Sequence, residues 1–129
     1  MVHIIDTHAL VWFLEGNEKL GKRALRVLKN SREKLVIPSI VLAEVKYLSF
    51  KGRTRLSIES VFEAIEKDSR CVVYPLDSNV VGAMPTKLEI HDSIICGTAL
   101  VYSNLLREEV KVISRDTEIK NSGIVRTLW

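Results

Sequence analysis

The sequence predicts an α/β protein, built as a three-layer α/β/α sandwich around a mostly parallel central sheet. Five short apolar runs rich in β-branched residues recur along the chain, without the polar alternation of half-exposed strands. The segments between them are mostly long enough for helices. A sheet buried on both faces needs helices on both sides, but the strand order does not follow from this pattern.

Each expected element has its own signal. The strands are expected at residues 2–5, 35–37, 71–74, 110–113 and 124–128. Apolar residues at helical spacing among charged ones predict two helices, over residues 21–30 and 57–67. A Pro-Ser pair at 38–39 opens a helix expected to run to about Phe50 and end near Gly52. A His-Asp pair at 91–92 opens another that is expected to run to about Leu106.

Size and composition are those of an ordinary globular domain. The chain has 129 residues, 47% of them apolar and 27% charged, so we expect residues 1–129 to form a single domain. The longest apolar run, Ala9 to Leu14, is far shorter than the roughly 20 residues of a membrane span. With no basic leader at the N-terminus, a cytoplasmic location is expected. Cys71 and Cys96 lack CxxC spacing and are expected as buried, reduced thiols.

Positive charge is concentrated in one segment. Residues 15–34 hold seven Lys or Arg and three Glu, while the whole chain carries a net charge of +3. A solvated helix face is the favoured interpretation, and attraction of a phosphate backbone is the alternative.

Two acids lie where parallel sheets place their ligands. Asp6 ends the first expected strand, and Asp116 follows the strand at 110–113 after Ser114 and Arg115. Ligand crevices of open α/β sheets lie at the carboxyl ends of strands. The alternative for each acid is a helix N-cap or a turn.

Two further acids lie on apolar helix faces. Glu44 falls between Val41 and Leu48 on one stripe of its helix, so a buried ion pair, an edge position or a bound metal must compensate its charge. Asp92 shares a face with the apolar side chain of Ile95, and Gly97 nearby permits close backbone approach. Helix capping is the alternative for Asp92.

The four acids together favour a site for a hard cation. Oxygen ligands suit Mg²⁺ or Mn²⁺, and His3, His8 and His91 are not spaced as a zinc ligand set. Crowded carboxylates repel one another and raise their own pKa values unless a cation intervenes.

Four segments resemble the PIN domains, in particular the VapC-like ribonuclease toxins of type II toxin–antitoxin pairs. They are Ile-Ile-Asp-Thr-His-Ala-Leu at 4–10, Pro-Ser-Ile-Val-Leu-Ala-Glu-Val at 38–45, His-Asp-Ser-Ile-Ile-Cys-Gly-Thr-Ala-Leu at 91–100 and Val-Ile-Ser-Arg-Asp-Thr at 112–117. Each segment is a weak signal, but four in the right order are fairly specific.

The resemblance implies a parallel sheet and an acidic site that holds one or two Mg²⁺ or Mn²⁺ ions. The metal and catalytic residues would be Asp6, Glu44, Asp92 and Asp116. The metal would activate a water for attack on an RNA phosphodiester. Ser114 replaces a usual Thr and keeps a hydroxyl able to orient Asp116 or a water at the metal. Cys96 and Gly97 stand where small residues such as Ala are usual, which affects packing more than chemistry.

The resemblance also implies partners. Candidates for gripping the RNA backbone are Lys22, Arg23, Arg26, Lys29, Lys51, Arg53 and Arg55. A homodimer is expected, together with an antitoxin that lies in an apolar groove. The run from Val11 to Leu14 would serve such an interface, although core packing is the favoured role for most of it.

Other functions remain to be weighed. A catalytically inactive PIN domain that binds RNA or protein is the strongest alternative, and the intact set of acids argues against it. A phosphoacceptor receiver domain would need an adjacent acid pair after the first strand, but Thr7 follows Asp6. No GxGxxG follows a strand, which argues against a Rossmann-type cofactor domain.

Overall fold

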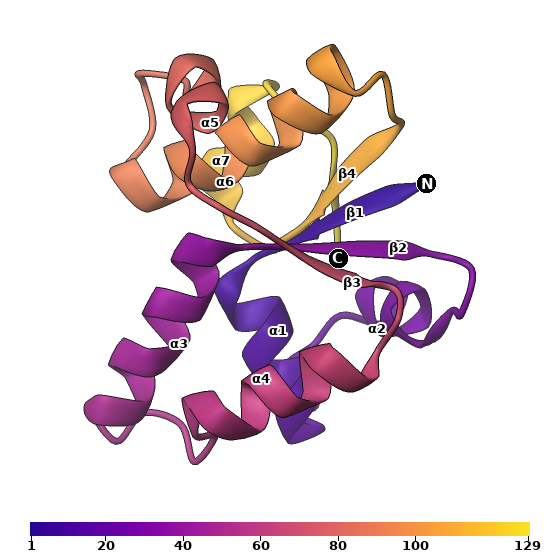
Figure 1. The fold of residues 1–129 in the computed structure, drawn as a ribbon, viewed down its shortest axis with the longest axis vertical. Helices are drawn as coiled ribbons and strands as arrows, with labels where there is room; N and C mark the ends of the chain where they lie inside the picture. The colour runs from indigo at the N-terminus through magenta and orange to yellow at the C-terminus, as the bar shows by residue number, and fades with distance from the viewer.

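A five-stranded parallel sheet separates two layers of helices in the computed structural model, which describes residues 1–129 (Figure 1). The strand order is β3-β2-β1-β4-β5, and every pair of neighbours is parallel. The strands are β1 (Val2–Ile5), β2 (Lys34–Pro38), β3 (Cys71–Tyr74), β4 (Val110–Ile113) and β5 (Thr127–Leu128). The predicted α/β sandwich is confirmed.

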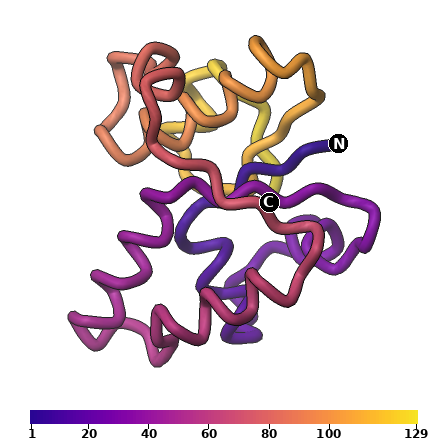
Figure 2. The backbone as a smooth tube through the Cα atoms, viewed as in Figure 1, coloured from indigo at the N-terminus to yellow at the C-terminus, as the bar shows by residue number.

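The helices divide between the two faces of the sheet. One face is covered by α1 (Thr7–Glu15), α2 (Lys22–Lys29), α3 (Ser39–Phe50) and α4 (Ile58–Lys67). After β3 the chain passes to the other face, as the tube in Figure 2 shows, where α5 (Ser78–Ala83), α6 (Ile90–Leu100) and α7 (Thr117–Ser122) lie. None of these helices combines the length and apolar character needed to cross a lipid bilayer.

The central strand β1 anchors the core. Ile4 pairs with Val36 of β2 on one side and with Val112 of β4 on the other. All three side chains are fully buried. A strand between two parallel neighbours with helices on both faces is buried on both sides, which explains the three aliphatic residues of β1. Its remaining residue, His3, is buried beside Glu33.

Some elements differ from the sequence-based expectation. β3 is an edge strand, and Val72 and Val73 in its middle are exposed rather than buried. The last strand has only two residues, because residues 124–126 precede the paired segment. The helix expected from 91 to about 106 is an α-helix only to Leu100 and continues as a π-helix over Val101–Leu105.

The first helix, α1, has no counterpart among the expected elements. Its residues are apolar on almost every side, because it packs between the sheet and its neighbouring helices. Gly16 ends it in the left-handed conformation, with φ of 66°, which glycine adopts without steric cost. The short helices α5 and α7 were likewise not expected.

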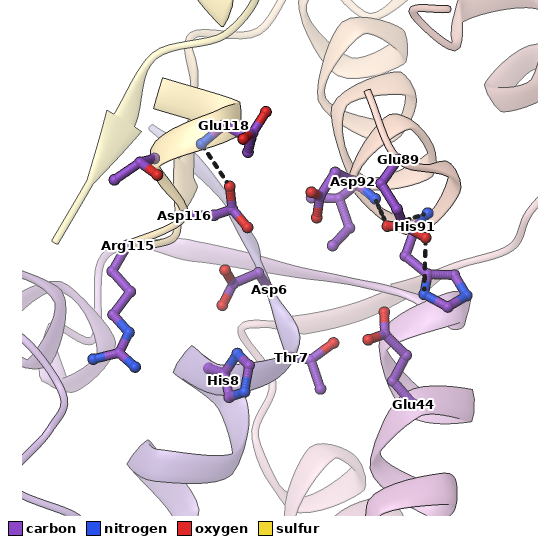
Figure 3. Close-up of a pocket in the computed structure, with 12 residues that line it drawn as sticks. Asp6, Thr7, His8, Glu44, Glu89, His91, Asp92, Arg115, Asp116 and Glu118 are labelled. Carbon is purple, nitrogen blue, oxygen red and sulfur yellow. Dashed lines mark hydrogen bonds and ion pairs between the residues drawn. The ribbon is translucent and has the colours of Figure 1, made fainter. Parts of the chain in front are cut away.

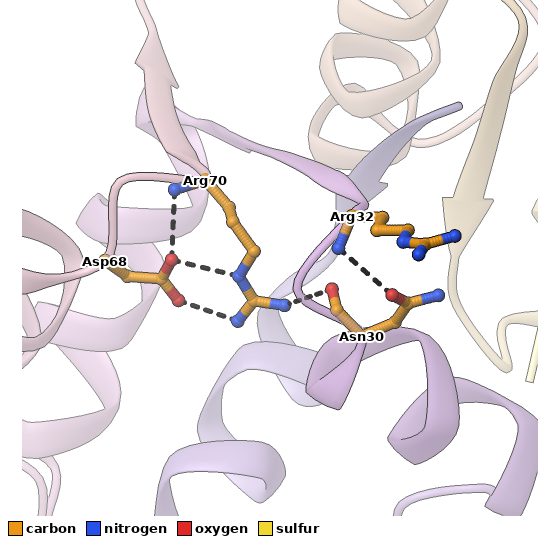
Figure 4. A network of polar contacts seen from close by, with 4 residues as sticks. All are labelled: Asn30, Arg32, Asp68 and Arg70. Carbon is orange, nitrogen blue, oxygen red and sulfur yellow. Dashed lines mark hydrogen bonds and ion pairs between the residues drawn. The ribbon is translucent and has the colours of Figure 1, made fainter.

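Polar contacts tie the loops together where β2 and β3 begin (Figure 4). The Arg70 guanidinium donates to both carboxylate oxygens of Asp68 at 3.0 and 2.7 Å, and Nη1 donates to the carbonyl of Asn30 at 2.7 Å. These hydrogen bonds from Arg70 hold the pKa of Asp68 below its usual value. The contact joins the loop after α2 to the turn before β3.

Gly97 marks the closest approach of α6 to α5. A Cβ at this position would lie 2.9 Å from the carbonyl oxygen of Val80 and 3.2 Å from Cγ of Met84. The glycine therefore permits the close backbone approach expected from the sequence. Cys96 beside it is buried and free, as expected, and Cys71 is free and half-buried.

The Gly97→Ala variant should be less stable than the wild type by about 1 to 3 kcal/mol, because the methyl group forces α5 away from α6. Gly82→Ala is the matched control, since a Cβ there meets no atom within 4 Å. It should be neutral or slightly stabilising. Urea denaturation measures both, and equal stability of the two variants would contradict this packing.

Candidate functional site

A cavity of about 430 Å³ opens at the carboxyl ends of β1 and β4 (Figure 3). Only one of its twelve lining residues, Ile95, is hydrophobic. The others are Asp6, Thr7, His8, Glu44, Glu89, His91, Asp92, Arg115, Asp116, Thr117 and Glu118. All four acids singled out from the sequence therefore line one cavity. It lies where the strand order reverses beside β1, which is the usual ligand position of a doubly wound sheet.

Asp6 follows β1 directly and caps α1, and Asp116 follows β4 after two residues and caps α7. Oδ1 of Asp6 accepts from the backbone N–H of Ala9 at 2.9 Å, and Oδ1 of Asp116 accepts from those of Glu118 and Ile119. Both acids are thus N-caps as well as cavity residues. The caps fix the orientation of each carboxylate.

Asp92 faces the cavity from the first turn of α6, and it is not the cap of that helix. Glu89 performs this role, because its Oε2 accepts from the N–H groups of His91 at 3.0 Å and Asp92 at 3.4 Å. The alternative that Asp92 serves as a cap is therefore wrong. Its carboxylate makes no hydrogen bond or ion pair within the protein.

Glu44 reaches the cavity from α3. Its Oε1 is buried and has no hydrogen-bond partner, and no ion pair involves this residue. The alternative of a buried ion pair is therefore wrong, whereas the half-buried side chain of Glu44 fits the alternative of an edge position. Burial raises the pKa of Glu44, and the nearby His91 partly opposes this effect. An unpaired buried carboxylate oxygen is costly unless a ligand compensates it.

Burial and mutual repulsion raise the pKa values of Asp6, Glu44 and Asp92. Burial raises the pKa of Asp6, although hydrogen bonds from Ser114 and Ala9 oppose it. The pKa of Asp92 is raised to about 6, first by burial and then by the charges of Asp116, Glu89, Glu44 and Asp6. The site therefore holds more negative charge than its own groups compensate.

The donor chemistry of the cavity fits a hard divalent cation. Its acids offer oxygen ligands only, and the unpartnered Oε1 of Glu44 and Oγ1 of Thr7 are buried at its wall. No three His, Cys, Asp or Glu side chains are close enough to hold an ion without some movement. Burial raises the pKa values of Asp6, Glu44 and Asp92, so a bound cation would offset an electrostatic cost at each of them.

Ser114 lies behind the acids at the end of β4. It is almost completely buried, and its Oγ accepts from the backbone N–H of Asp116 at 3.0 Å. The hydroxyl also lowers the pKa of Asp6. Ser114 therefore contacts the backbone of Asp116 and lies close to Asp6, and its expected role in orienting Asp116 or a water at the metal stays a prediction.

The basic candidates lie outside this cavity. Lys22, Arg23, Arg26 and Lys29 are exposed on α2, and Lys51, Arg53 and Arg55 are exposed after α3. Only Arg53 lines an adjacent depression, which shares Glu44 and His91 with the acidic cavity and is also lined by Tyr47. The structure does not bring the other basic candidates to the acids.

Several cavity residues were missed from the sequence. His8 and His91 lie there together, whereas His3 pairs with Glu33 at 3.1 Å elsewhere. Arg115 and Glu89 line the cavity as well. The only sequence signal for these residues is that each lies within three positions of one of the four acids.

The apolar run after the first strand belongs to the core. Val11 and Trp12 are 4% and 8% exposed, and Phe13 and Leu14 pack partly buried against the same cluster. Core packing is therefore confirmed as the main role of this run.

A family model for the PIN domain matches residues 3–124. No curated protein sequence matches the chain. VapBC2 from Rickettsia felis, bound to a DNA fragment from its promoter, has a similar fold (TM-score 0.67, 15% identity, 99% of this chain and 98% of that chain). A toxin–antitoxin complex from Klebsiella pneumoniae is also similar (TM-score 0.66, 19% identity, 98% and 96% of the two chains). The resemblance found in the sequence is confirmed, and the chain belongs to the PIN domain family.

Proposed function

We propose that this protein is a metal-dependent endoribonuclease and the toxin of a toxin–antitoxin pair. The observation that carries the proposal is the meeting of four carboxylates from four different elements in one polar cavity, with no Lys or Arg paired to any of them. Such an arrangement is unfavourable for folding alone and favourable for holding a divalent cation.

Asp6, Asp92, Asp116 and Glu44 would hold one or two Mg²⁺ or Mn²⁺ ions. When bound, such a metal would activate a water for attack and offset negative charge on the phosphodiester. Asp6 and Asp116 are preoriented by their caps, and Ser114 fixes the backbone at Asp116. No protein nucleophile is needed.

RNA would cross the carboxyl edge of the sheet. Arg53 and Tyr47 line the depression beside Glu44, where a phosphate and a base would find a cation and an aromatic ring. Lys51 lies 5.5 Å from the Tyr47 ring and adds positive charge there. The remaining basic candidates on α2 would attract the backbone at longer range.

A protein partner is supported by the neighbouring structures and by exposed apolar side chains. Both similar folds come from toxin–antitoxin complexes. Phe50 and Tyr47 on α3 are 85% and 57% exposed, and Phe62 on α4 is 50% exposed. Large exposed apolar side chains of this kind are candidates for contact with a partner. An antitoxin and a second copy of the chain are the partners proposed for it.

An inactive PIN domain that binds RNA or protein is the alternative. The observation in its favour is that no three potential ligands are close enough to hold an ion without movement. Metal-dependent cleavage distinguishes the two functions.

The wild type should cleave single-stranded RNA with Mn²⁺ or Mg²⁺ but not with EDTA. Asp6→Asn and Asp92→Asn should each reduce the rate by more than about 100-fold, since even outer-shell residues of metal sites contribute about 10 to 100-fold. Ser114→Ala should lose about 10 to 100-fold, and Glu66→Gln on the exposed side of α4 is the control. Cleavage that survives in both Asp variants would reject the site, and binding without cleavage would favour the alternative.

Asp92→Asn should stabilise the metal-free protein at pH 8 and have little effect near pH 3, below the unfolded-state pKa of 3.8. The folded pKa of Asp92 is raised from 3.8 to about 6, so the wild type loses stability as pH rises through this range. Asn carries no charge at either pH. The expected gain at pH 8 is on the order of 1 kcal/mol, because solvent screens part of the repulsion at this partly exposed carboxylate. Thermal unfolding in EDTA measures this gain. Adding Mn²⁺ should reduce the difference in stability between Asp92→Asn and the wild type. A variant less stable than the wild type at pH 8 would contradict the repulsion between these carboxylates.

A further inference from the structure

Arg115 is the only Lys or Arg among the residues that line the acidic cavity. It precedes Asp116 in the chain, yet its guanidinium is not within 4.0 Å of any carboxylate oxygen. Figure 3 shows its side chain extending away from Asp116, on the side of the cavity where His8 lies. The cation therefore remains unpaired beside a group of unpaired anions.

The Arg115 guanidinium contacts Trp12 instead of a carboxylate. The guanidinium carbon lies 4.4 Å from the centre of the Trp12 ring, within the range of a cation–π interaction. Stacking on an aromatic face uses the plane of the guanidinium and leaves its N–H groups, which point outward in that plane, free to donate.

Trp12 is itself held rigidly. Its side chain is buried, and its ring packs edge-on against that of Trp129 at 5.8 Å. Gly21 lies against Trp129 so closely that a Cβ there would be 2.6 Å from the carbonyl carbon of Trp129. The Trp12 ring that contacts Arg115 is therefore held in place before any ligand binds, which lowers the entropic cost of binding.

We propose that Arg115 binds a backbone phosphate of the RNA strand, next to the phosphodiester that is cleaved, and so positions the strand over the acids. This inference rests on the proposed nuclease function and adds to it a substrate contact. A planar guanidinium with free N–H groups matches the two oxygens of a phosphate. The attacked phosphate would lie among the carboxylates, and Arg115 would contact the next phosphate along the RNA strand.

Binding, not cleavage, tests this role. All variants are made in the Asp6→Asn background so that the RNA stays intact. Each protein is titrated into a labelled single-stranded oligoribonucleotide in the presence of Mg²⁺, and the binding constant is measured at several salt concentrations. Arg115→Ala and Arg115→Lys are compared with two controls. Lys19→Ala removes a cation that also lies over Trp12, at 5.8 Å, but does not line the cavity. Arg126→Ala removes an arginine from the amino edge of the sheet, beside Met1 and Val110.

Arg115→Ala should weaken binding and reduce the slope of log K against log salt by about 0.7, the value for one phosphate contact on a single strand. Arg115→Lys should keep the salt dependence of the parent but bind RNA more weakly. It retains the positive charge and loses the paired N–H groups that contact two phosphate oxygens. Both controls should keep the slope of the parent. An unchanged slope in Arg115→Ala, or equal losses in Arg115→Ala and the two controls, would overturn the proposal.

Cleavage by the wild type is measured in parallel and separates the two claims. If the wild type does not cleave RNA but Arg115→Ala loses the expected slope, the nuclease function fails and the phosphate contact stands. If the wild type cleaves and the slope is unchanged, the nuclease function stands and the role of Arg115 fails. A parent protein that does not bind the oligoribonucleotide at all overturns the phosphate contact.

Discussion

The pairing of β1 with β2 on one side and β4 on the other determines where the acids of the site lie. It buries Ile4 and Ile5 and places Asp6 at the end of the central strand, beside the end of β4 and its Asp116. The helices that follow β2 and precede β4 then bring Glu44 and Asp92 to the same edge. The hydrophobic core thus gathers four negative charges that would otherwise avoid one another, and the carboxylates weaken the fold that assembles them. Burial first, and then the charges of the neighbouring acids, raise the pKa of Asp92 to about 6.

The sequence predicted the parallel sheet and pointed to four acids that line one cavity, because both leave local signals. Buried strands appear as apolar runs, and a Glu on an apolar stripe or an Asp after a strand stands out against its neighbours. The helix α1 gave no such signal, since its residues are apolar on nearly every side and lack a helical period. The exposure of Val72 and Val73 depends on β3 lying at the edge of the sheet, and strand order cannot be read from a single strand.

The cavity residues missed from the sequence depend on tertiary contacts. Nothing local distinguishes Arg115 from any surface arginine, and its position follows from Trp12, a residue more than a hundred positions away in the chain. The same holds for Glu89, whose capping of α6 frees Asp92 for the cavity. The basic segment at residues 15–34 is the reverse case, with a clear signal in the sequence and no place in the cavity. Its charge is conspicuous in the sequence, but none of its residues lines the acidic cavity.

A crystal structure of the protein soaked with Mn²⁺ tests the central claim most directly, because anomalous scattering locates the metal without reference to activity. The account predicts an anomalous peak in the cavity, coordinated by Asp6 and Asp92 and lying within reach of Asp116, with Glu44 joined to it directly or through water. A cavity without such a peak at millimolar Mn²⁺, or a peak held only by surface residues elsewhere, would contradict the assignment of these carboxylates as a metal centre.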